Sequence, residues 1–480
     1  MKKPKSSPAK ATLPAIKSEA QVLHSLRDMY LSTLSRPLNP VELAVKLRRL
    51  PTVTEQHRQQ CAEERLVTGE ELQRQVVVPH PAAIGLYYSM RTALHIRYTA
   101  VTADDSRILQ QFHGLEAGTI PGRIDNSLIR PSASIGLLGP TGSGKSTLLE
   151  TIADLMPGCV RRSDVIPGAE VVQVPIIYVA LTGDSTIKNL LLRIIEAIDR
   201  RVGTDANTSR ILRSKPSAET LKIYVQQCCV RYGVGIIFVD EMQALTSSRA
   251  DGAALVINEL LYIRDALGIP MVFSGTYRMM SLLTCDARLT RRVSQNGLFP
   301  MSYSTSPNGV YWTQLCDARW KALIVRNPTP MTKSMRALLF KCTQGMTWAL
   351  PSLLIKAQQE AILSAECDED EIIDEQLIID TFATRCTEIH KMVQALKSRD
   401  ATLLETEPDL YHRDFDAHET QKRTAEFQLL KELDIGGDDP ALLEATSTEP
   451  AKSAKSAKSA TVHRPARRRK TVSPAMKKAS

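Results

Sequence analysis

The sequence has few aromatic residues and no long apolar run. Phe, Trp and Tyr together make up 5% of the 480 residues. No apolar stretch approaches the ~20 residues that a membrane-spanning helix needs. The N-terminus is basic and lacks the apolar segment of a secretory signal. We therefore expect a cytoplasmic protein that does not bind membranes.

The nine cysteines form no CxxC pair and no Cys/His cluster. Zinc sites and the disulfide frameworks of secreted proteins both reveal themselves by such spacings. The sequence therefore favours reduced and mostly buried thiols over metal binding or disulfide bonds.

Acidic residues are absent from both ends of the chain. Residues 1–18 contain five Lys and residues 451–480 contain ten Lys or Arg, with no Asp or Glu in either segment. The formal net charge is +9, so a charge of −6 is left for residues 19–450 once these tail charges are removed. Any surface for nucleic acid on the folded part must therefore be a local patch.

Composition and periodicity divide the chain into segments. Residues 133–304 alternate short apolar strands with amphipathic helices, which predicts an α/β domain with a parallel sheet. Residues 305–400 lack strand patterns and predict a small helical domain. The other segments are predicted as a disordered basic N-terminus, a mixed helical region, a helical extension and a disordered basic tail, over residues 1–18, 19–132, 401–436 and 437–480.

Apolar runs and helical periodicity predict the individual elements. We expect strands at residues 134–138, 174–181, 236–239, 271–274 and, in short form, near 297–301. In the N-terminal region we expect helices at residues 20–35, 40–50 and 82–98. Residues 185–202 place Ile and Leu on one face of a helix that packs on the sheet, with Ser185 as its N-cap.

A glycine-rich turn follows the first predicted strand. Residues 136–149 read GLLGPTGSGKSTLL, which fits GxxxxGK[ST] between a strand and a helix. Glycines let backbone N–H groups converge on phosphate oxygens, and the helix N-terminus adds its positive dipole end. We expect Lys145 to reach the β- and γ-phosphates and Ser146 to coordinate Mg²⁺. The residues predicted to bind ATP are Gly139, Pro140, Thr141, Gly142, Ser143, Gly144, Lys145, Ser146 and Thr147.

Two adjacent carboxylates end a strand that is predicted to be buried. Residues 236–245 read IIFVDEMQAL, and neighbouring acids resist burial unless a cation shares their site. The pair comes about ninety residues after the phosphate loop. We therefore predict that Asp240 binds Mg²⁺, directly or through water. Glu241 is predicted to orient and deprotonate the water that attacks the γ-phosphate.

Two further groups of polar residues are candidates for catalysis. The strand predicted at residues 271–274 ends with Ser274 and is followed by Thr276. We favour Thr276 as the hydrogen-bond partner of the γ-phosphate or of the attacking water. The stretch CDARLTRRV contains three arginines, and one of them could stabilise phosphoryl transfer in a neighbouring subunit. A solvated basic helix end, or contacts to a phosphate backbone, are the alternatives. These arginines are Arg288, Arg291 and Arg292.

Together these motifs resemble an AAA+ P-loop ATPase: a Walker A loop, a DE Walker B, a GT after the fourth strand and a helical lid. The stretch RYGVGIIFVDEMQALTSSRADGAALVINELLYIRDALGIPMVFSGTYRMMSLL is similar in detail to TnsC, the ATPase regulator of Tn-seven-like bacterial transposons. The shared marks are DE-x-Q, a serine-rich loop, a long helix ending in LGIP, and D-x-R-x-x-R-R from Asp286 to Arg292. The resemblance covers residues 133–400 well and residues 19–132 loosely. It extends at greater distance to TniB and Mu B.

The resemblance implies a function. ATP-bound subunits would assemble on duplex DNA as a ring or helical filament with hexameric or heptameric turns. A target-selector protein or an RNA-guided complex would recruit them, and the assembly would signal to transposase and endonuclease subunits before ATP hydrolysis disassembles it. The resemblance also maps DNA contacts to Thr186 and Lys188, which are equally well interpreted as a helix cap and a solvated lysine.

Some alternatives stay open on the sequence alone. A nucleotide-switched signalling or scaffold ATPase without DNA binding, or a helicase-loader-like remodeler, would share the same motifs. The basic tail could bind transposase or DNA, or serve solubility alone. The lid stretch QGMTWALPSLLIKAQ also departs from many AAA+ proteins, because it has no arginine at its helix start and only Lys356 nearby.

Overall fold

The computed structural model describes residues 18–113, 132–183, 186–247, 250–280, 291–365 and 370–398. The chain divides into two compact units, residues 1–419 and 420–480, and every described residue belongs to the first. The predictions for both chain ends and for Arg288 concern residues outside the described ranges.

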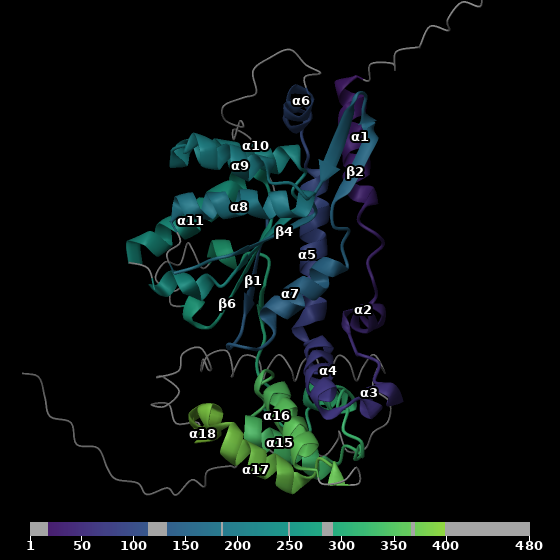
Figure 1. Ribbon diagram of the computed structural model, residues 1–480. Coiled ribbons are helices and arrows are strands. Elements are labelled where there is room, and N and C mark those ends of the chain that lie inside the picture. The colour runs from purple at the N-terminus through teal and green to yellow at the C-terminus, as the bar shows by residue number, and fades with distance from the viewer. Residues whose placement is uncertain are drawn as a thin grey trace, which may run out of the picture. The chain divides into compact units, whose positions relative to one another are not determined.

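A parallel five-stranded sheet lies at the centre of the α/β part, with helices on both of its faces (Figure 1). Its order is β4-β5-β6-β1-β7, and neighbouring strands run parallel throughout. The strands are β1 (Ser134–Leu138), β4 (Ile176–Ala180), β5 (Ile236–Asp240), β6 (Met271–Gly275) and β7 (Leu298–Pro300). All five fall on runs predicted from the sequence. The predicted α/β fold, a parallel sheet flanked by helices, is confirmed.

The helices of the α/β part bury apolar faces against these strands. Helix α8 (Ile187–Val202) contacts β4, and Leu190, Ile194 and Ile198 are among its buried residues. Thr186 is the N-cap of this helix, because its Oγ1 accepts a hydrogen bond from the Asn189 N–H at 3.2 Å. Ser185, the predicted N-cap, lies outside the described residues. The other helices here are α7 (Lys145–Asp154), α9 (Ala206–Ser214), α10 (Ala218–Arg231) and α11 (Ala250–Leu267).

An antiparallel hairpin of β2 (Val160–Ile166) and β3 (Ala169–Gln173) was not predicted. Strand β2 reads VRRSDVI, and its first five residues are partly or fully exposed. Such a strand has neither the apolar run of a buried strand nor a clean alternation. The turn contains Gly168 at φ +82°, a conformation that favours glycine.

The N-terminal helices share the hydrophobic core of the sheet. Leu26 and Met29, together with Leu86, Met90 and Leu94, pack in one cluster with the strand residues. The core therefore continues across the predicted boundary at residue 132, and the domain limits stay predictions. The helices are α1 (Glu19–Ser32), α2 (Pro40–Leu47), α3 (Glu55–Gln59), α4 (Ala62–Gln75), α5 (Ala82–Thr99) and α6 (Ala103–Phe112), of which α3, α4 and α6 were not predicted.

A second hydrophobic cluster forms the helical lid. Trp312, Leu339 and Leu353 are fully buried in it, and Val76 and Val78 from the segment between α4 and α5 join it. The lid helices are α14 (Val310–Lys321), α15 (Lys333–Thr343), α16 (Ala349–Ser364), α17 (Glu375–Arg385) and α18 (His390–Ser398). Within the described ranges, no helix combines the length and apolarity that crossing a membrane requires.

One buried ion pair joins the N-terminal region to the lid, and its removal is testable. Arg65 of α4 pairs with Glu371, and each side chain is 3% exposed. We expect Arg65→Met to lower the free energy of unfolding by about 3–5 kcal/mol, because it leaves a buried carboxylate without its cation. Urea unfolding measures this change.

The control lies on the same helix. Arg74 pairs with Glu70 at the surface, where the two side chains are 75% and 39% exposed. Arg74→Met should therefore cost less than about 1 kcal/mol. Equal losses from the two variants would contradict the interpretation that burial sets the difference.

Candidate active site

The phosphate loop connects β1 to α7 and depends on glycine for its shape. Gly142 and Gly144 have φ values of +65° and +91°, which other residues rarely adopt. At Gly139 an added Cβ would lie 2.3 Å from the carbonyl oxygen of Met301. Close packing against the segment after β7 and left-handed backbone therefore account for the glycines of the motif.

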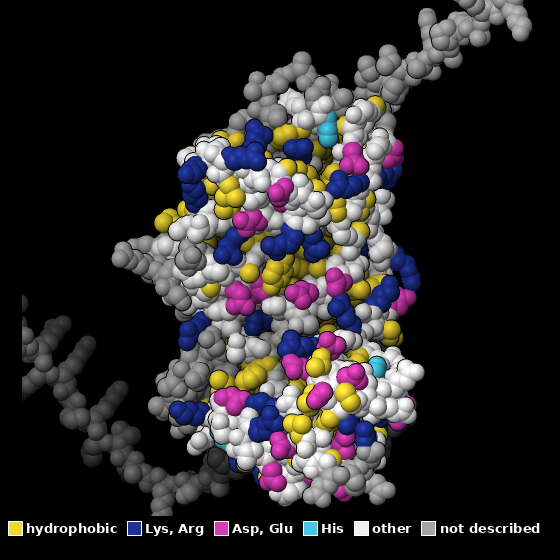
Figure 2. All heavy atoms as spheres, viewed as in Figure 1, with side chains coloured by type: hydrophobic (Ala, Val, Ile, Leu, Met, Phe, Trp, Pro, Cys, Tyr) yellow, Lys and Arg dark blue, Asp and Glu magenta, His cyan; other side chains and the backbone are white. Residues whose placement is uncertain are grey.

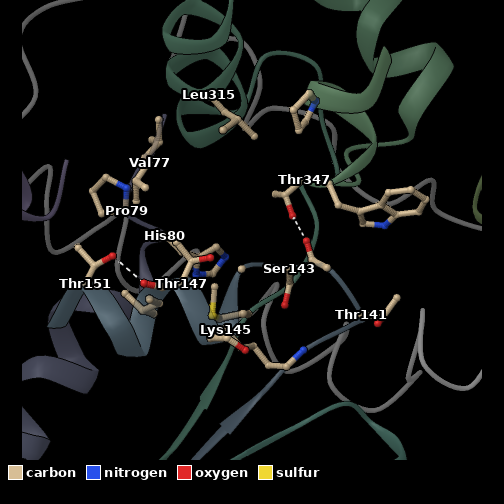
Figure 3. A pocket seen from close by; sticks show the side chains of 18 of the residues that line it. Val77, Pro79, His80, Thr141, Ser143, Lys145, Thr147, Thr151, Leu315 and Thr347 are labelled. Carbon is tan, nitrogen blue, oxygen red and sulfur yellow. Dashed lines mark hydrogen bonds between the residues drawn. The ribbon is translucent and has the colours of Figure 1, made fainter. Parts of the chain in front are cut away.

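The loop carries a buried cation and a buried hydroxyl. The Lys145 ammonium donates hydrogen bonds to the carbonyl oxygens of Gly139 and Pro140 at 3.0 and 2.9 Å. The Ser143 Oγ is buried and has no hydrogen-bond partner among the described residues. A buried polar atom without a partner is costly. A phosphate oxygen is a suitable acceptor for both groups, so the loop fits a nucleotide (Figure 3).

Asp240, at the end of β5, is 1% exposed and accepts hydrogen bonds from three directions. The Ser146 Oγ donates to its Oδ2 at 2.6 Å, and the Tyr178 hydroxyl donates to the same oxygen. The Glu241 backbone N–H donates to Oδ1 at 2.9 Å. The fold thus brings together the hydroxyl and the carboxylate that were predicted to bind Mg²⁺, two oxygen ligands of the kind that this ion prefers.

Tyr178 was missed by sequence reasoning. It lies on β4, where its backbone pairs with Phe238 of β5. Burial and the hydrogen bond to Asp240 raise the pKa of its hydroxyl well above the ordinary value. The phenol therefore stays protonated, and a donor, at neutral pH. The only signal in the sequence was the hydroxyl of this tyrosine within the otherwise apolar run VPIIYVAL.

A chain of hydrogen bonds joins the ends of β5 and β6. Glu241 is exposed and has φ +60°, a left-handed conformation that is unusual for a residue with a side chain. Its carboxylate accepts a hydrogen bond from Gln243 Nε2, while Gln243 Oε1 accepts one from the Thr276 N–H at 3.0 Å. Gln243 was not predicted as a site residue, although DE-x-Q contains it. Thr276 lines the cavity next to the loop, and Ser274 lies buried outside the lining.

This cavity has a volume of about 390 Å³ and is enclosed by three parts of the chain. The phosphate loop forms one wall, and the segment from Val76 to His80 forms the second. The lid supplies the third, including Leu315 and Thr347. Figure 3 shows Val77, Pro79 and His80 on one side of the cavity and Thr347 on another. Apolar walls beside a phosphate loop suit the base and sugar of a nucleotide. Sequence reasoning missed both the Val76–His80 and the lid walls.

The remaining predicted residues lie outside the cavity lining. Arg291 is exposed, and Arg292 pairs with Asp265 within the same chain. Thr186 caps α8 through its hydroxyl, and Lys188 is exposed on the first turn of that helix. Their predicted roles toward a neighbouring subunit or DNA stay predictions.

Comparison with known families agrees with this geometry. Residues 130–283 match a family model described as an AAA domain. The parallel sheet with helices on both faces that this part of the chain forms agrees with that match. With a phosphate loop after β1 and an acid at the end of β5, it has the fold of a P-loop NTPase. No curated protein matches the chain.

Three solved structures are similar to parts of this chain at low sequence identity. The Walker-type ATPase PABY2304 of Pyrococcus abyssi has 14% identity and a TM-score of 0.36, over 56% of this chain and 71% of its own. The ORC2 protein of Aeropyrum pernix, solved as ADPNP–ADP complexes, has 16% identity and a TM-score of 0.34, over 52% of this chain and 61% of its own. Cdc6p from Pyrobaculum aerophilum has 14% identity and a TM-score of 0.31, over 51% and 57%. Likenesses at this level carry no function over to this chain.

The donor from Tyr178 can be tested through stability. We expect Tyr178→Phe to lower the free energy of unfolding by about 1.5–3 kcal/mol, because a buried carboxylate loses a hydrogen bond to a charged group. A matched control is Tyr88→Phe, which removes a hydroxyl that donates to the Leu38 carbonyl oxygen at 2.7 Å. A neutral bond of this kind contributes about 0.5–1.5 kcal/mol. If urea unfolding gives a smaller loss for Tyr178→Phe than for the control, Asp240 does not depend on this donor.

Proposed function

We propose that this protein is an ATP-dependent, DNA-binding AAA+ regulator of transposition of the TnsC type. It assembles as a ring or filament on target duplex DNA, links a target selector to the transposase, and disassembles on ATP hydrolysis. The ATPase part of the proposal is supported by the 2.6 Å hydrogen bond between Ser146 and Asp240. The adjacent loop carries Lys145 and the buried Ser143 hydroxyl, both of which can donate hydrogen bonds to phosphate. The transposition part rests on the similarity of residues 231–283 to TnsC.

The chain's own residues suggest how hydrolysis proceeds. Lys145 exchanges its two carbonyl partners for phosphate oxygens of ATP. Ser146 and Asp240 would hold Mg²⁺, which would supply positive charge to neutralise the phosphates. Glu241 turns from Gln243 to the attacking water and accepts its proton. Because Glu241 is exposed, that proton can return to solvent after the γ-phosphate has left as inorganic phosphate.

Two groups of residues would act between subunits and on DNA. Arg291 is the exposed member of the described arginine pair, so it is the stronger candidate for a finger in trans, with Arg288 as the untested third. Thr186 and Lys188 would contact the sugar–phosphate backbone. On the face drawn in Figure 2, Lys and Arg are interspersed with Asp and Glu among the described residues. Such a surface agrees with DNA contacts that are few and local.

The nucleotide site is tested by two substitutions with opposite outcomes. Lys145→Ala should abolish binding of labelled ATP in the presence of Mg²⁺. Glu241→Gln should retain binding but slow hydrolysis at least ~10²-fold, since a general base contributes about that much. It should also trap nucleotide-bound assemblies, visible by negative-stain microscopy.

The control for both variants is Glu63→Gln, which alters an exposed carboxylate on α4. It should behave as wild type. A Glu241→Gln protein that hydrolyses ATP normally would remove Glu241 from the role of base.

DNA binding is tested by its salt dependence. We expect ATP-dependent assembly to be stronger on duplex DNA and to weaken as salt rises. Lys188→Ala should lower the slope of log affinity against log salt by about one per subunit contact. Lys333→Ala, an exposed lysine of the lid, is the matched control. Equal assembly with and without DNA across the salt range would favour a nucleotide-switched scaffold ATPase.

A further inference from the structure

The lid contacts the phosphate loop directly, at the peptide groups of Thr141 and Gly142. The Thr347 hydroxyl donates a hydrogen bond to the Gly142 carbonyl oxygen at 2.6 Å (Figure 3). The Tyr303 hydroxyl donates another to the Thr141 carbonyl oxygen. Two successive carbonyl groups of the loop are therefore fixed from outside, by residues far from it in sequence.

Trp348 completes this contact by packing on Gly142. A Cβ built on Gly142 would lie 2.3 Å from Trp348 Cδ1 and 2.6 Å from Cγ, so the indole fills the space that a side chain would need. The turn that carries the indole is itself fixed, because a Cβ on Gly345 would lie 2.0 Å from the Ser304 carbonyl oxygen. A change in the backbone conformation at Gly142 therefore requires Thr347 and Trp348 to move as well.

Two basic residues of the lid near this point hydrogen-bond to other parts of the chain, although the buried Arg319 Nε has no hydrogen-bond partner among the described residues. Lys356 of α16 donates to the Arg385 carbonyl oxygen and forms an ion pair with Glu388. Arg319 of α14 reaches the cavity lining, and burial lowers its pKa to about 10, so it stays cationic at neutral pH. Its guanidinium donates to the Gln73 carbonyl oxygen, and Gln73 donates back to the Arg319 carbonyl oxygen at 2.7 Å. Arg319 thus ties the lid to α4.

We propose that Thr347 and Trp348 are positioning residues of the nucleotide site, which transmit occupancy of the phosphate loop to the lid through the Gly142 peptide. This inference rests on the proposed nucleotide binding. Phosphate bound by the loop amides reorients the Thr141–Gly142 carbonyl groups, and the Thr347 hydroxyl and the Trp348 indole follow them. The lid of this protein has no arginine at the start of α16 to contact phosphate, and these two residues make its position depend on bound nucleotide instead.

Tryptophan emission tests the proposal without relying on catalysis. Trp312 and Trp320 are 0% and 8% exposed in the lid core, so they supply a constant background. We expect saturating MgATP to change the emission of the wild-type protein, and Trp348→Phe to remove that change. Binding of a fluorescent ATP analogue measures occupancy independently, and Lys145→Ala gives the baseline without nucleotide.

The hydrogen bond is then tested by a matched pair of variants. At saturating nucleotide, Thr347→Val should reduce the amplitude of the emission change at least three-fold. Thr347→Ser, which keeps the hydroxyl, should restore at least two thirds of it. Tyr303→Phe removes the second hydrogen bond and should also reduce the amplitude, which provides a test if Thr347→Val fails to fold.

The outcomes separate this inference from the proposed function. A full emission change in Thr347→Val, or wild-type protein that binds the analogue with no change dependent on Trp348, would overturn the positioning role alone. Wild-type protein that does not bind the analogue at all would overturn the proposed function and this inference together.

Discussion

The burial of the Asp240 carboxylate is the constraint around which the site is arranged. A carboxylate that is 1% exposed must be matched by donors, and the chain supplies them from three places. Ser146 comes from the first turn of α7, Tyr178 from β4, and the Glu241 N–H from the residue that follows the strand. These donors can meet only if β1 and β4 end at the same edge of the sheet as β5. Parallel pairing in this strand order produces that edge.

The strands and the phosphate loop could be predicted from the sequence because their signals are local. Runs such as SIGLL and IIFVD are apolar over a whole strand, and the loop is defined by glycines within eight residues. The hairpin of β2 and β3 escaped prediction because charged residues interrupt its first strand. Tyr178 and Gln243 were not predicted as site residues. Tyr178 matters because it contacts Asp240 on the neighbouring strand, and Gln243 because it contacts Thr276, which follows another strand. No periodicity of one segment encodes such a pairing.

The walls of the cavity were even harder to predict from local sequence patterns. Val76 and Val78 belong to the apolar cluster of the lid, while Leu86 and Leu94, 8 and 16 residues after Val78, belong to that of the sheet. The chain thus passes from one cluster to the other here, and residues 76–80 line the cavity. The sequence of this segment, VVVPHPAA, predicts little beyond an extended stretch with prolines. Its place in the site follows from long-range packing alone.

The route of this segment also determines what a functional fragment of the chain must include. The AAA family model spans residues 130–283, yet one cavity wall comes from before residue 81 and another from after residue 310. A fragment cut at the limits of the family match would lose α5, which contacts β1 and β7 and shares their hydrophobic cluster. It would also retain the phosphate loop without two of the surfaces that line the adjoining cavity. The smallest self-sufficient unit is therefore set by the path of the N-terminal helices rather than by the extent of the recognisable motif.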